Sequence, residues 1–193
     1  MKRNSGFTLI ELLIVVAIIA ILALIAVPNF LEAQTRSKVA RAKNDMRTLR
    51  VALEAYRLDN TQYPRDIRGT GTWTTWYQLT TPIAYLTSVP HSPWRTWEYI
   101  HAGYNDPGMP PYDYAQYEDL QDETWTPRLH AAGLLYTVVC SGPDEDNDLG
   151  WDQVDYIVVY PARRPSALGY LYDPTNGSVS SGDIIMTNRG FPN

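Results

Sequence analysis

An apolar run from Phe7 to Val27, with Glu11 as its only charge, constrains the fold of this chain more than any other feature. A helix of about 20 apolar residues is long enough to cross the hydrocarbon core of a bilayer, so the run predicts a membrane-spanning helix. A carboxylate inside such a helix costs roughly 2.5 to 3.5 kcal/mol on insertion scales. Glu11 therefore needs a partner or a function that offsets this cost.

A short basic leader, residues 1–6, precedes the run and carries Lys2 and Arg3. A secretory signal peptide also begins with positive charge, but its apolar region spans only about 7 to 15 residues and ends at a cleavage site of small residues. The run here is longer and continues past Pro28 into a charged helical pattern. We therefore predict a retained anchor. The positive-inside rule places its amino terminus in the cytoplasm and the rest of the chain across the membrane.

After Pro28 the apolar residues thin into one helical stripe with alternating steps of three and four residues. Its members are Val39, Ala42, Met46, Leu49, Leu53 and Tyr56. With the anchor, the stripe predicts one helix of about 50 residues, roughly 75 to 80 Å long. Pro28 lacks a backbone donor, so a kink or local unwinding is expected there. The stripe is either a seam for another chain or the face that packs on this chain's own sheet, and its end at a proline-containing boundary favours the sheet.

Six basic residues lie mostly off this stripe: Arg36, Lys38, Arg41, Lys43, Arg47 and Arg50. They form either a solvated face or a surface for anionic headgroups just outside the anchor. We do not interpret them as a nucleic-acid site, because aromatic residues do not alternate with these charges and the formal net charge of the chain is −5.

Beyond residue 60 the composition changes, since nearly all of the 14 Tyr, all 6 Trp and most of the 14 Pro lie there. This composition and length indicate one loop-rich globular domain. Strands are predicted at residues 134–139 and 156–160, with weaker ones at 169–172 and 184–187. Asn176-Gly177 supplies the turn between the last two. The expected fold is α+β, with a long N-terminal helix packed on a small antiparallel sheet that has long irregular loops.

This pattern divides the chain into four parts. They are a leader at residues 1–6, a membrane-spanning helix at 7–30, its amphipathic continuation at 31–60 and a globular domain at 61–193. Residues 73–125 show no sustained period, and we expect a long, partly ordered excursion there. Aromatic clusters can stack on sugars or partners. In a domain with only 3 Phe, these aromatic residues are more simply the core.

An acidic loop at residues 141–155 holds the clearest binding chemistry of the domain. Carboxylates fall at positions one, three, five, nine and twelve of a calcium-loop count, which are Asp144, Asp146, Asp148, Asp152 and Asp155. This spacing lets a curled loop surround calcium with oxygen ligands, and hard oxygens suit Ca²⁺ far better than zinc. Leu149 stands where an EF-hand needs Gly, so the loop is not an EF-hand. A solvated acidic loop without metal is the alternative.

No arrangement in the sequence indicates catalysis. His91, His101 and His130 are scattered, and the chain has no nucleophile elbow, zinc-binding helix or phosphate loop. Cys140 is the only cysteine, so no disulfide can form within the chain. A bound metal could stabilise the folded state instead.

The residues Gly6-Phe7-Thr8-Leu9-Ile10-Glu11, followed by an apolar stretch and Pro28, resemble the processing site of type IV pilins and of the pseudopilins of type II secretion. The resemblance implies that a prepilin peptidase cuts after Gly6 and methylates the new terminal amine of Phe7. It gives Glu11 a partner too, because the ammonium of one subunit and the carboxylate of another could neutralise each other in an apolar filament core. Ser141-Gly142-Pro143-Asp144 resembles the calcium loop of the major pseudopilins.

The same resemblance implies a structural subunit rather than an enzyme. The subunit would be anchored in the inner membrane by a single span, with its globular domain in the periplasm, and would assemble into a filament that helps export folded proteins. Its partners would be the membrane, other copies of itself, the prepilin peptidase, minor pseudopilins and the inner-membrane assembly platform. A type IV surface pilin for adhesion, motility or DNA uptake is the first alternative, and a membrane-anchored binding module is the second. A single cysteine disfavours the surface pilin, which often carries a carboxy-terminal disulfide.

Overall fold

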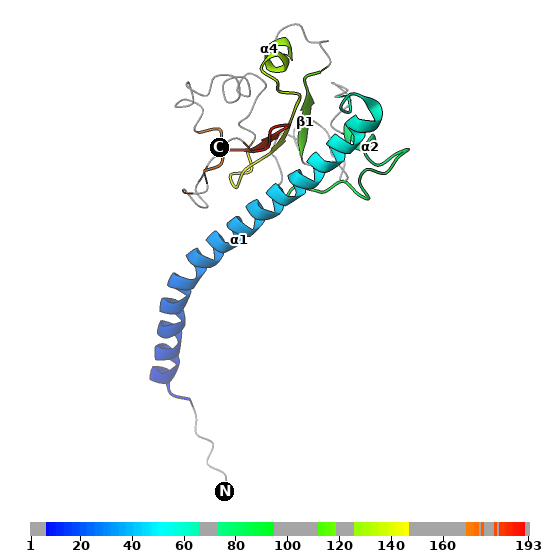
Figure 1. Cartoon of the computed structure of the whole chain (residues 1–193). Coiled ribbons are helices and arrows are strands. Elements are labelled where there is room, and N and C mark those ends of the chain that lie inside the picture. The colour runs from blue at the N-terminus through cyan, green and yellow to red at the C-terminus, as the bar shows by residue number, and fades with distance from the viewer. Residues whose placement is uncertain are drawn as a thin grey trace.

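The computed structural model describes residues 7–65, 73–94, 112–118, 126–146, 169–173, 175, 180 and 182–191. Its dominant element is helix α1, Leu9–Asn60, whose 52 residues form a rod of about 78 Å. Thr8 caps the start of the helix with its side chain, and Thr61 ends it in the left-handed conformation with its N–H bonded to the Arg57 carbonyl. The single long helix predicted from the sequence is confirmed (Figure 1).

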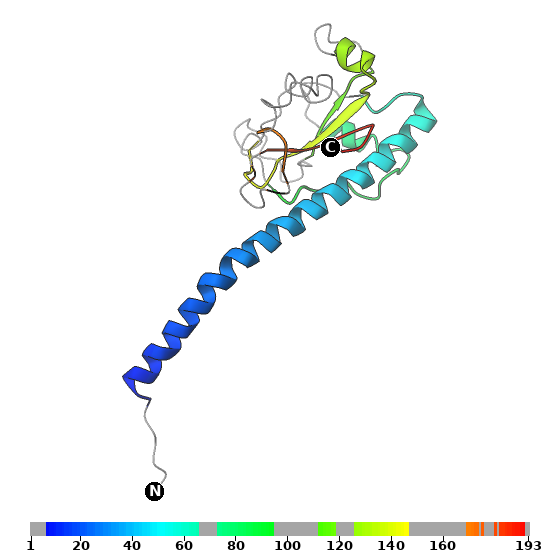
Figure 2. The same ribbon diagram turned by 60° about the vertical axis from the view of Figure 1, so that its left-hand side comes forward.

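Pro28 lies inside α1 without interrupting it. The ring deprives the carbonyl of Leu24, four residues back, of its usual donor. The turns on both sides nevertheless remain helical, and α1 curves gradually in two views rather than bending at one point (Figures 1 and 2). The expected local unwinding at Pro28 is therefore wrong, and the helix bends as a gradual curve rather than as a sharp kink. One missing hydrogen bond is tolerated because the neighbouring bonds of the helix persist.

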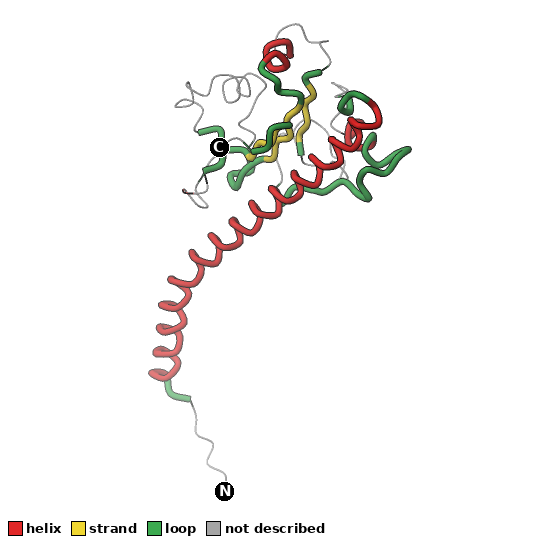
Figure 3. The backbone as a smooth tube through the Cα atoms, in the orientation of Figure 1, coloured by secondary structure: helices red, strands yellow, loops and turns green. Residues whose placement is uncertain are grey.

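The described strands form one antiparallel sheet in the order β1-β2-β3. They are β1, Asp113–Gln116; β2, Tyr136–Cys140; and β3, Ile184–Thr187. Val139 of the central strand lies opposite Asp113 on one side and Ile185 on the other. All residues of β2 are buried, as a strand covered on both faces requires. The α+β architecture expected from the sequence is confirmed (Figure 3).

The predicted strands compare unevenly with this sheet. The strand at 184–187 is confirmed, and the strand at 134–139 is confirmed with its start shifted to Tyr136. Leu134 instead closes the preceding turn, because its N–H bonds to the Leu129 carbonyl. The strand predicted at 169–172 is wrong, since its only ladder contact is an isolated bridge from Leu171 to Asp183. The strand predicted at 156–160 lies outside the described residues.

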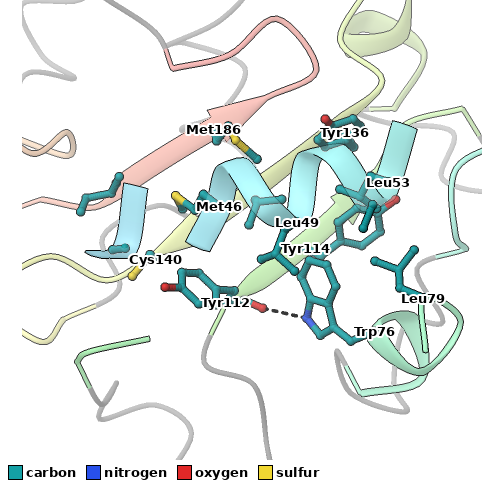
Figure 4. Packing of buried hydrophobic residues seen from close by; sticks show 14 of the residues in the cluster. Met46, Leu49, Leu53, Trp76, Leu79, Tyr112, Tyr114, Tyr136, Cys140 and Met186 are labelled. Atoms are coloured by element: carbon teal, nitrogen blue, oxygen red, sulfur yellow. Dashed lines mark hydrogen bonds between the residues drawn. The ribbon is translucent and has the colours of Figure 1, made fainter. Parts of the chain in front are cut away.

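The stripe of α1 packs on the helix-facing side of the sheet, as the favoured interpretation predicted (Figure 4). Its buried residues are Val39, Ala42, Met46, Leu49, Ala52 and Leu53. They meet alternate residues of the strands, among them Tyr136, Val138 and Met186. Tyr56 is partly buried against the same cluster. The stripe is therefore the face by which α1 joins its own domain.

Aromatic residues supply much of this core. Trp76, from the short helix α2, Trp73–Tyr77, is buried and donates from its indole to the Tyr112 carbonyl at 3.1 Å (Figure 4). Its ring lies 5.4 Å from that of Tyr114 in β1. The interpretation of the aromatic segment as core is confirmed for Trp76, Trp94, Tyr112, Tyr114 and Tyr117, whereas Tyr77 is exposed. A strand, β1, lies in this segment, where a largely irregular excursion was expected.

The opposite face of the sheet carries a smaller apolar cluster. Helix α4, Thr126–Ala131, covers it through Leu129, which is buried with Tyr117, Val139 and Ile185. The three layers are therefore α1, the sheet and α4. Because α1 is much longer than the sheet it covers, its first half extends beyond the domain (Figures 1 and 2).

Candidate functional site

Residues 9–31 of α1, called here the exposed half, have no cover in the folded chain. Every side chain in this segment is exposed, with Leu9 at 80% and Leu24 at 77% of full exposure. A continuous apolar cylinder of this kind is unstable in water and requires lipid or other helices around it. Among the described helices, α1 is long and apolar enough to cross a membrane. The exposed half is therefore the membrane anchor and the first part of the site.

Glu11 lies in the first turn of the exposed half, where it takes part in a capping box with Thr8. Its carboxylate oxygen Oε2 accepts the Thr8 backbone N–H at 2.8 Å and the Thr8 hydroxyl at 2.7 Å. In return, the Glu11 N–H donates to the Thr8 hydroxyl at 3.4 Å. These bonds satisfy helix-end donors that otherwise lack partners.

The second carboxylate oxygen of Glu11, Oε1, makes no hydrogen bond with any residue that the structure describes. Within the described residues, only one of the two carboxylate oxygens therefore has a hydrogen-bond partner. Phe7 is exposed at 72% and lies outside the helix, close in sequence to Thr8 and Glu11. Gly6, the other residue of the predicted processing site, lies outside the described residues. Phe7 and the Glu11 carboxylate thus lie near each other in the sequence at the exposed end of α1.

Residues 32–60 of α1, called here the docked half, are held to the domain by a polar network as well as by the apolar stripe. Glu54 accepts the hydroxyls of Tyr63 at 2.9 Å and Tyr136 at 3.3 Å. Arg57 lies over the Tyr63 ring and pairs with Glu118 at 2.8 Å. Glu118 also accepts the Tyr63 N–H at 3.0 Å.

Burial and the bond to Glu54 raise the pKa of Tyr63 to about 12. Burial and the nearby Glu54 charge likewise raise the pKa of Tyr136 well above its usual range. Both hydroxyls are therefore protonated donors at neutral pH, as the network needs. The sequence analysis missed this network, because Glu54 lies one position beyond Leu53 and its partners are distant in the chain. No local spacing signals such a cluster.

Three of the six basic residues contact the end of the chain itself. Lys43 lies 5.9 Å from the Tyr172 ring centroid and 5.8 Å from that of Phe191. Arg47 lies 5.4 Å from the Phe191 centroid, and Arg50 donates to the Asn188 carbonyl at 3.0 Å. These residues, Lys43, Arg47 and Arg50, form a clamp on the C-terminal segment. The remaining basic residues, Arg36, Lys38 and Arg41, are exposed.

The acidic loop is described only at its beginning. Asp144 accepts the Gly182 N–H through Oδ2 at 2.9 Å and the Asp146 N–H through Oδ1 at 3.5 Å. The bond to Gly182 ties the loop to the start of β3, where a Cβ on Gly142 would lie 2.0 Å from the Gly182 carbonyl oxygen. The remaining predicted ligands, Asp148, Asp152 and Asp155, lie outside the described residues. The described parts of the chain contain no group of three or more His, Cys, Asp or Glu residues suited to a metal.

No catalytic arrangement forms within the described residues. His91 and His130 are exposed and lie in different parts of the fold, and His101 lies outside the described residues. Cys140 is buried 3.2 Å from the Ser92 hydroxyl, and burial raises the pKa of its thiol to about 12. A thiol with so high a pKa is a poor nucleophile at neutral pH.

A capped apolar helix, half of it bare and half docked on a small antiparallel sheet, defines a pilin-like protein. Two family models match the chain consecutively. Residues 1–27 match the prokaryotic N-terminal methylation motif, and residues 29–117 match type II secretion system (T2SS), protein G. The chain belongs to the family of type II secretion system core protein G, which comprises structural subunits rather than enzymes.

Curated relatives agree with this assignment. The type II secretion system core protein G of Vibrio cholerae is 33% identical over 111 residues, which cover 53% of this chain and 75% of that protein. The Pseudomonas aeruginosa protein of the same name is 43% identical over 68 residues, 35% of this chain and 48% of the relative. The type IV major pilin protein PilA of Myxococcus xanthus is 52% identical over 61 residues, 32% of this chain and 28% of the pilin.

The chain thus spans less than half the length of two of these relatives and three quarters of the third. No solved structure matches it significantly.

Proposed function

We propose that this protein is a structural subunit of a type II secretion pseudopilus, anchored in the inner membrane and assembled into a periplasmic filament that helps export folded proteins. One observation carries the proposal: the exposed half of α1 is apolar apart from Glu11 and Asn29 and is uncovered, yet it is continuous with the docked half. Lipid can cover the exposed half before assembly. The same half of neighbouring subunits can cover it afterwards.

Processing after Gly6 would prepare the exposed half to leave the lipid and pack against neighbouring subunits. A prepilin peptidase would release residues 1–6 with Lys2 and Arg3, and would leave a methylated ammonium on Phe7. The Oε1 oxygen of Glu11 is available to that ammonium on a neighbouring subunit, while Oε2 keeps its bonds to Thr8. A buried ion pair that loses one partner is destabilised by about 3 to 5 kcal/mol, so subunits in the wrong register would be rejected.

Orientation and partners follow from the same scheme. Lys2 and Arg3 hold the amino terminus in the cytoplasm by the positive-inside rule, which places the sheet domain in the periplasm. Besides other copies of itself, the subunit would contact the prepilin peptidase, the minor pseudopilins and the assembly platform of the inner membrane.

A surface pilin is the second candidate, because PilA of Myxococcus xanthus shares 52% identity over 61 residues. That alignment covers only 28% of the pilin, whereas the Vibrio cholerae protein G is covered over 75%. The chain's single cysteine also excludes an intrachain disulfide. Secretion is therefore the favoured function.

The test of assembly separates the charge of Glu11 from its capping role. Glu11→Gln keeps an oxygen for the Thr8 N–H but removes the charge, because glutamine also serves in capping boxes. We expect this variant to enter the membrane normally and to form no filaments in electron micrographs. Glu32→Gln, which changes an exposed carboxylate paired with Arg36 in the same helix, is the matched control and should give normal filaments.

Normal filaments from Glu11→Gln would show that assembly does not need the negative charge of Glu11. Imaging and secretion assays on the same strains separate the two candidate functions. Loss of protein export in Glu11→Gln, together with wild-type filaments that are confined to the periplasm, supports the pseudopilus. Wild-type filaments on the cell surface, together with unchanged protein export in Glu11→Gln, would support the surface pilin instead.

We also propose that the acidic loop binds calcium through Asp144, Asp146, Asp148, Asp152 and Asp155. The two described carboxylates fit a hard cation, because both are exposed and each Asp144 oxygen accepts one N–H from the described residues. Asp144 already ties the loop to Gly182, so an ion held there would reinforce the junction between β2 and β3. A ligand that binds only the folded state stabilises it by mass action.

Calorimetry and thermal melting test the calcium site without any assay of secretion. We expect Ca²⁺ binding and a raised melting temperature, both weakened in Asp152→Asn and Asp155→Asn. Asp173→Asn, which changes an exposed carboxylate in another loop, is the control and should leave binding unchanged. Absence of heat and of any calcium-dependent melting shift would leave a solvated acidic loop.

A further inference from the structure

The six basic residues of α1 separate into two groups that the sequence alone did not distinguish. Lys43, Arg47 and Arg50 form the clamp on the C-terminal segment. The other three, Arg36, Lys38 and Arg41, are called here the collar. They are exposed and make no hydrogen bond or ion pair with the sheet domain among the described residues, although the charge of Arg36 acts on Tyr172 and that of Arg41 acts on Tyr112. The collar is the group that lies nearer the anchor.

The collar lies at the depth where lipid headgroups begin. The exposed half ends at Leu31, and its 23 residues span about 34 Å, close to the roughly 30 Å of a hydrocarbon core. Arg36 follows Leu31 by about 7 Å along the axis and Arg41 by about 15 Å. The first residue of α1 buried by the domain is Val39, so this stretch of helix emerges from the bilayer with little cover. Long basic side chains can reach back toward a membrane surface from such positions.

The collar spans more than half of the helix circumference instead of facing one neighbour. At about 100° per residue, Arg36 and Lys38 point to nearly opposite sides, and Arg41 lies between them on the solvent side. Arg36 pairs with Glu32, and Arg41 approaches Asp45 at 3.7 Å, both as i,i+4 pairs. The two arginine side chains retain 67% and 64% exposure, and exposed pairs of this kind are weak. Lys38 forms no ion pair with any described residue.

The charge of the rest of the chain makes the collar distinctive. Residues 61–193 contain 7 Lys and Arg against 16 Asp and Glu, a formal charge of −9. Asp144, Glu145, Asp146 and Asp173 are among its exposed carboxylates. An acidic domain is repelled by an anionic membrane, so positive charge next to the anchor is not a general property of this protein. On the side of the anchor that leads to the domain, the collar is the positive charge nearest to the membrane.

We propose that the collar binds the anionic phospholipid headgroups of the leaflet from which α1 emerges. Three basic side chains around the helix would fix how deeply the anchor sits and would gather anionic lipid at its exit. The proposal requires a membrane-inserted helix and does not depend on filament assembly. It favours lipid over a second copy because the collar follows the apolar anchor directly along α1 and spans more than half of the helix circumference.

A fluorescence experiment on the full chain in vesicles tests this directly. Ser37→Cys places a donor dye inside the collar at an exposed position, and Cys140 does not compete for the label because it is buried and its pKa is raised to about 12. The vesicles mix phosphatidylcholine with a minority of phosphatidylglycerol. Energy transfer is compared between acceptors attached to the acyl chains of either lipid. We expect about threefold more transfer to phosphatidylglycerol, lost at high salt.

A collar variant and two control variants locate the effect. Arg36→Gln, Lys38→Gln and Arg41→Gln together should reduce the transfer ratio to about one. Glutamine at the three clamp positions, Lys43→Gln, Arg47→Gln and Arg50→Gln, should leave the ratio near threefold. Arg128→Gln on α4, which leaves the clamp intact, should also leave the ratio near threefold. Equal transfer to both lipids in the wild type, or an unchanged ratio in the collar variant, would overturn the proposal. A ratio that rises with the number of chains per vesicle would also overturn it, in favour of contact between copies.

Discussion

The two halves of α1 share one backbone but obtain their stability from different sources. The docked half buries six residues against the sheet and adds the polar network around Glu54. The exposed half buries none and is rich in Ile and Val, which are less favourable in helices than unbranched residues. It therefore depends on an apolar surrounding, where backbone hydrogen bonds cannot be exchanged for bonds to water. A continuous helix in this structure does not imply uniform stability along its length.

The sharpest test of this contrast is the same truncation in each half. Leu49→Ala removes a fully buried side chain and leaves a cavity, so the free energy of unfolding should fall by about 3 to 4 kcal/mol. Leu24→Ala, at a position 77% exposed, should leave it unchanged within about 0.5 kcal/mol. Denaturant unfolding of the full chain in detergent micelles measures both. Equal losses would mean that the exposed half also folds against the domain.

A second test weakens the sheet that covers the docked half. Gly142→Ala would place a Cβ 2.0 Å from the Gly182 carbonyl oxygen, and the backbone would have to move. We expect a loss of about 2 to 3 kcal/mol in the free energy of unfolding. Gly169→Ala is the matched control, since its Cβ would meet nothing within 4 Å. If both variants melted at the wild-type temperature, the close packing of Gly142 on Gly182 would not hold the sheet.

Alkaline pH should loosen the docked half. The pKa of Tyr63 is about 12 in the folded chain, against an ordinary value near 10. Its contribution to stability is complete below pH 10 and is lost as pH rises toward 12, because the unfolded chain releases the proton first. The loss should amount to about 1 to 2 kcal/mol, partly because of Tyr63 and partly because of other buried tyrosines. Tyr63→Phe should reduce the slope of the free energy of unfolding against pH, measured by denaturant unfolding between pH 9 and 12. An unchanged slope would show that Tyr63 does not contribute to the loss of stability.

The smallest expected effect distinguishes the clamp from the collar. Lys43→Gln removes two contacts with aromatic rings and should lower the free energy of unfolding by about 0.5 to 1 kcal/mol. Lys38→Gln removes the same charge from the collar and should change nothing measurable in micelles without anionic lipid. Thermal melting of the two variants side by side gives the comparison. A larger effect from Lys38→Gln would reverse the assignment of the two groups.

Elements with a strong local period were predictable from the sequence. The stripe at steps of three and four specified α1 and its buried face, although Ala52 was not included because the alternating steps pass from Leu49 to Leu53. The run of Tyr, Val and Ile residues similarly located β2 and β3. Strand β1, Asp-Tyr-Ala-Gln, has no alternating pattern and few β-branched residues. Its position is determined by pairing with β2, which only the folded chain shows.

The candidate site also combines features that a local sequence pattern predicts with features that depend on tertiary contacts. Phe7 and Glu11 could be selected from a contiguous motif, and the bare anchor from its composition. The half-satisfied carboxylate of Glu11 could not be anticipated, because it depends on which oxygen Thr8 uses. The separation of six basic residues into clamp and collar was likewise invisible, since it depends on where the C-terminal segment returns to α1. Tertiary contacts between distant residues carry this information.

The cap at Thr8 determines the shape that the start of the chain offers to a protease. Thr8 has an extended backbone, with φ −80° and ψ 152°, and helical geometry begins only at Leu9. A peptidase cannot accommodate a peptide bond that is wound inside a helix. Cleavage after Gly6 would therefore take place two residues ahead of the cap, and the newly formed end would inherit an intact first turn.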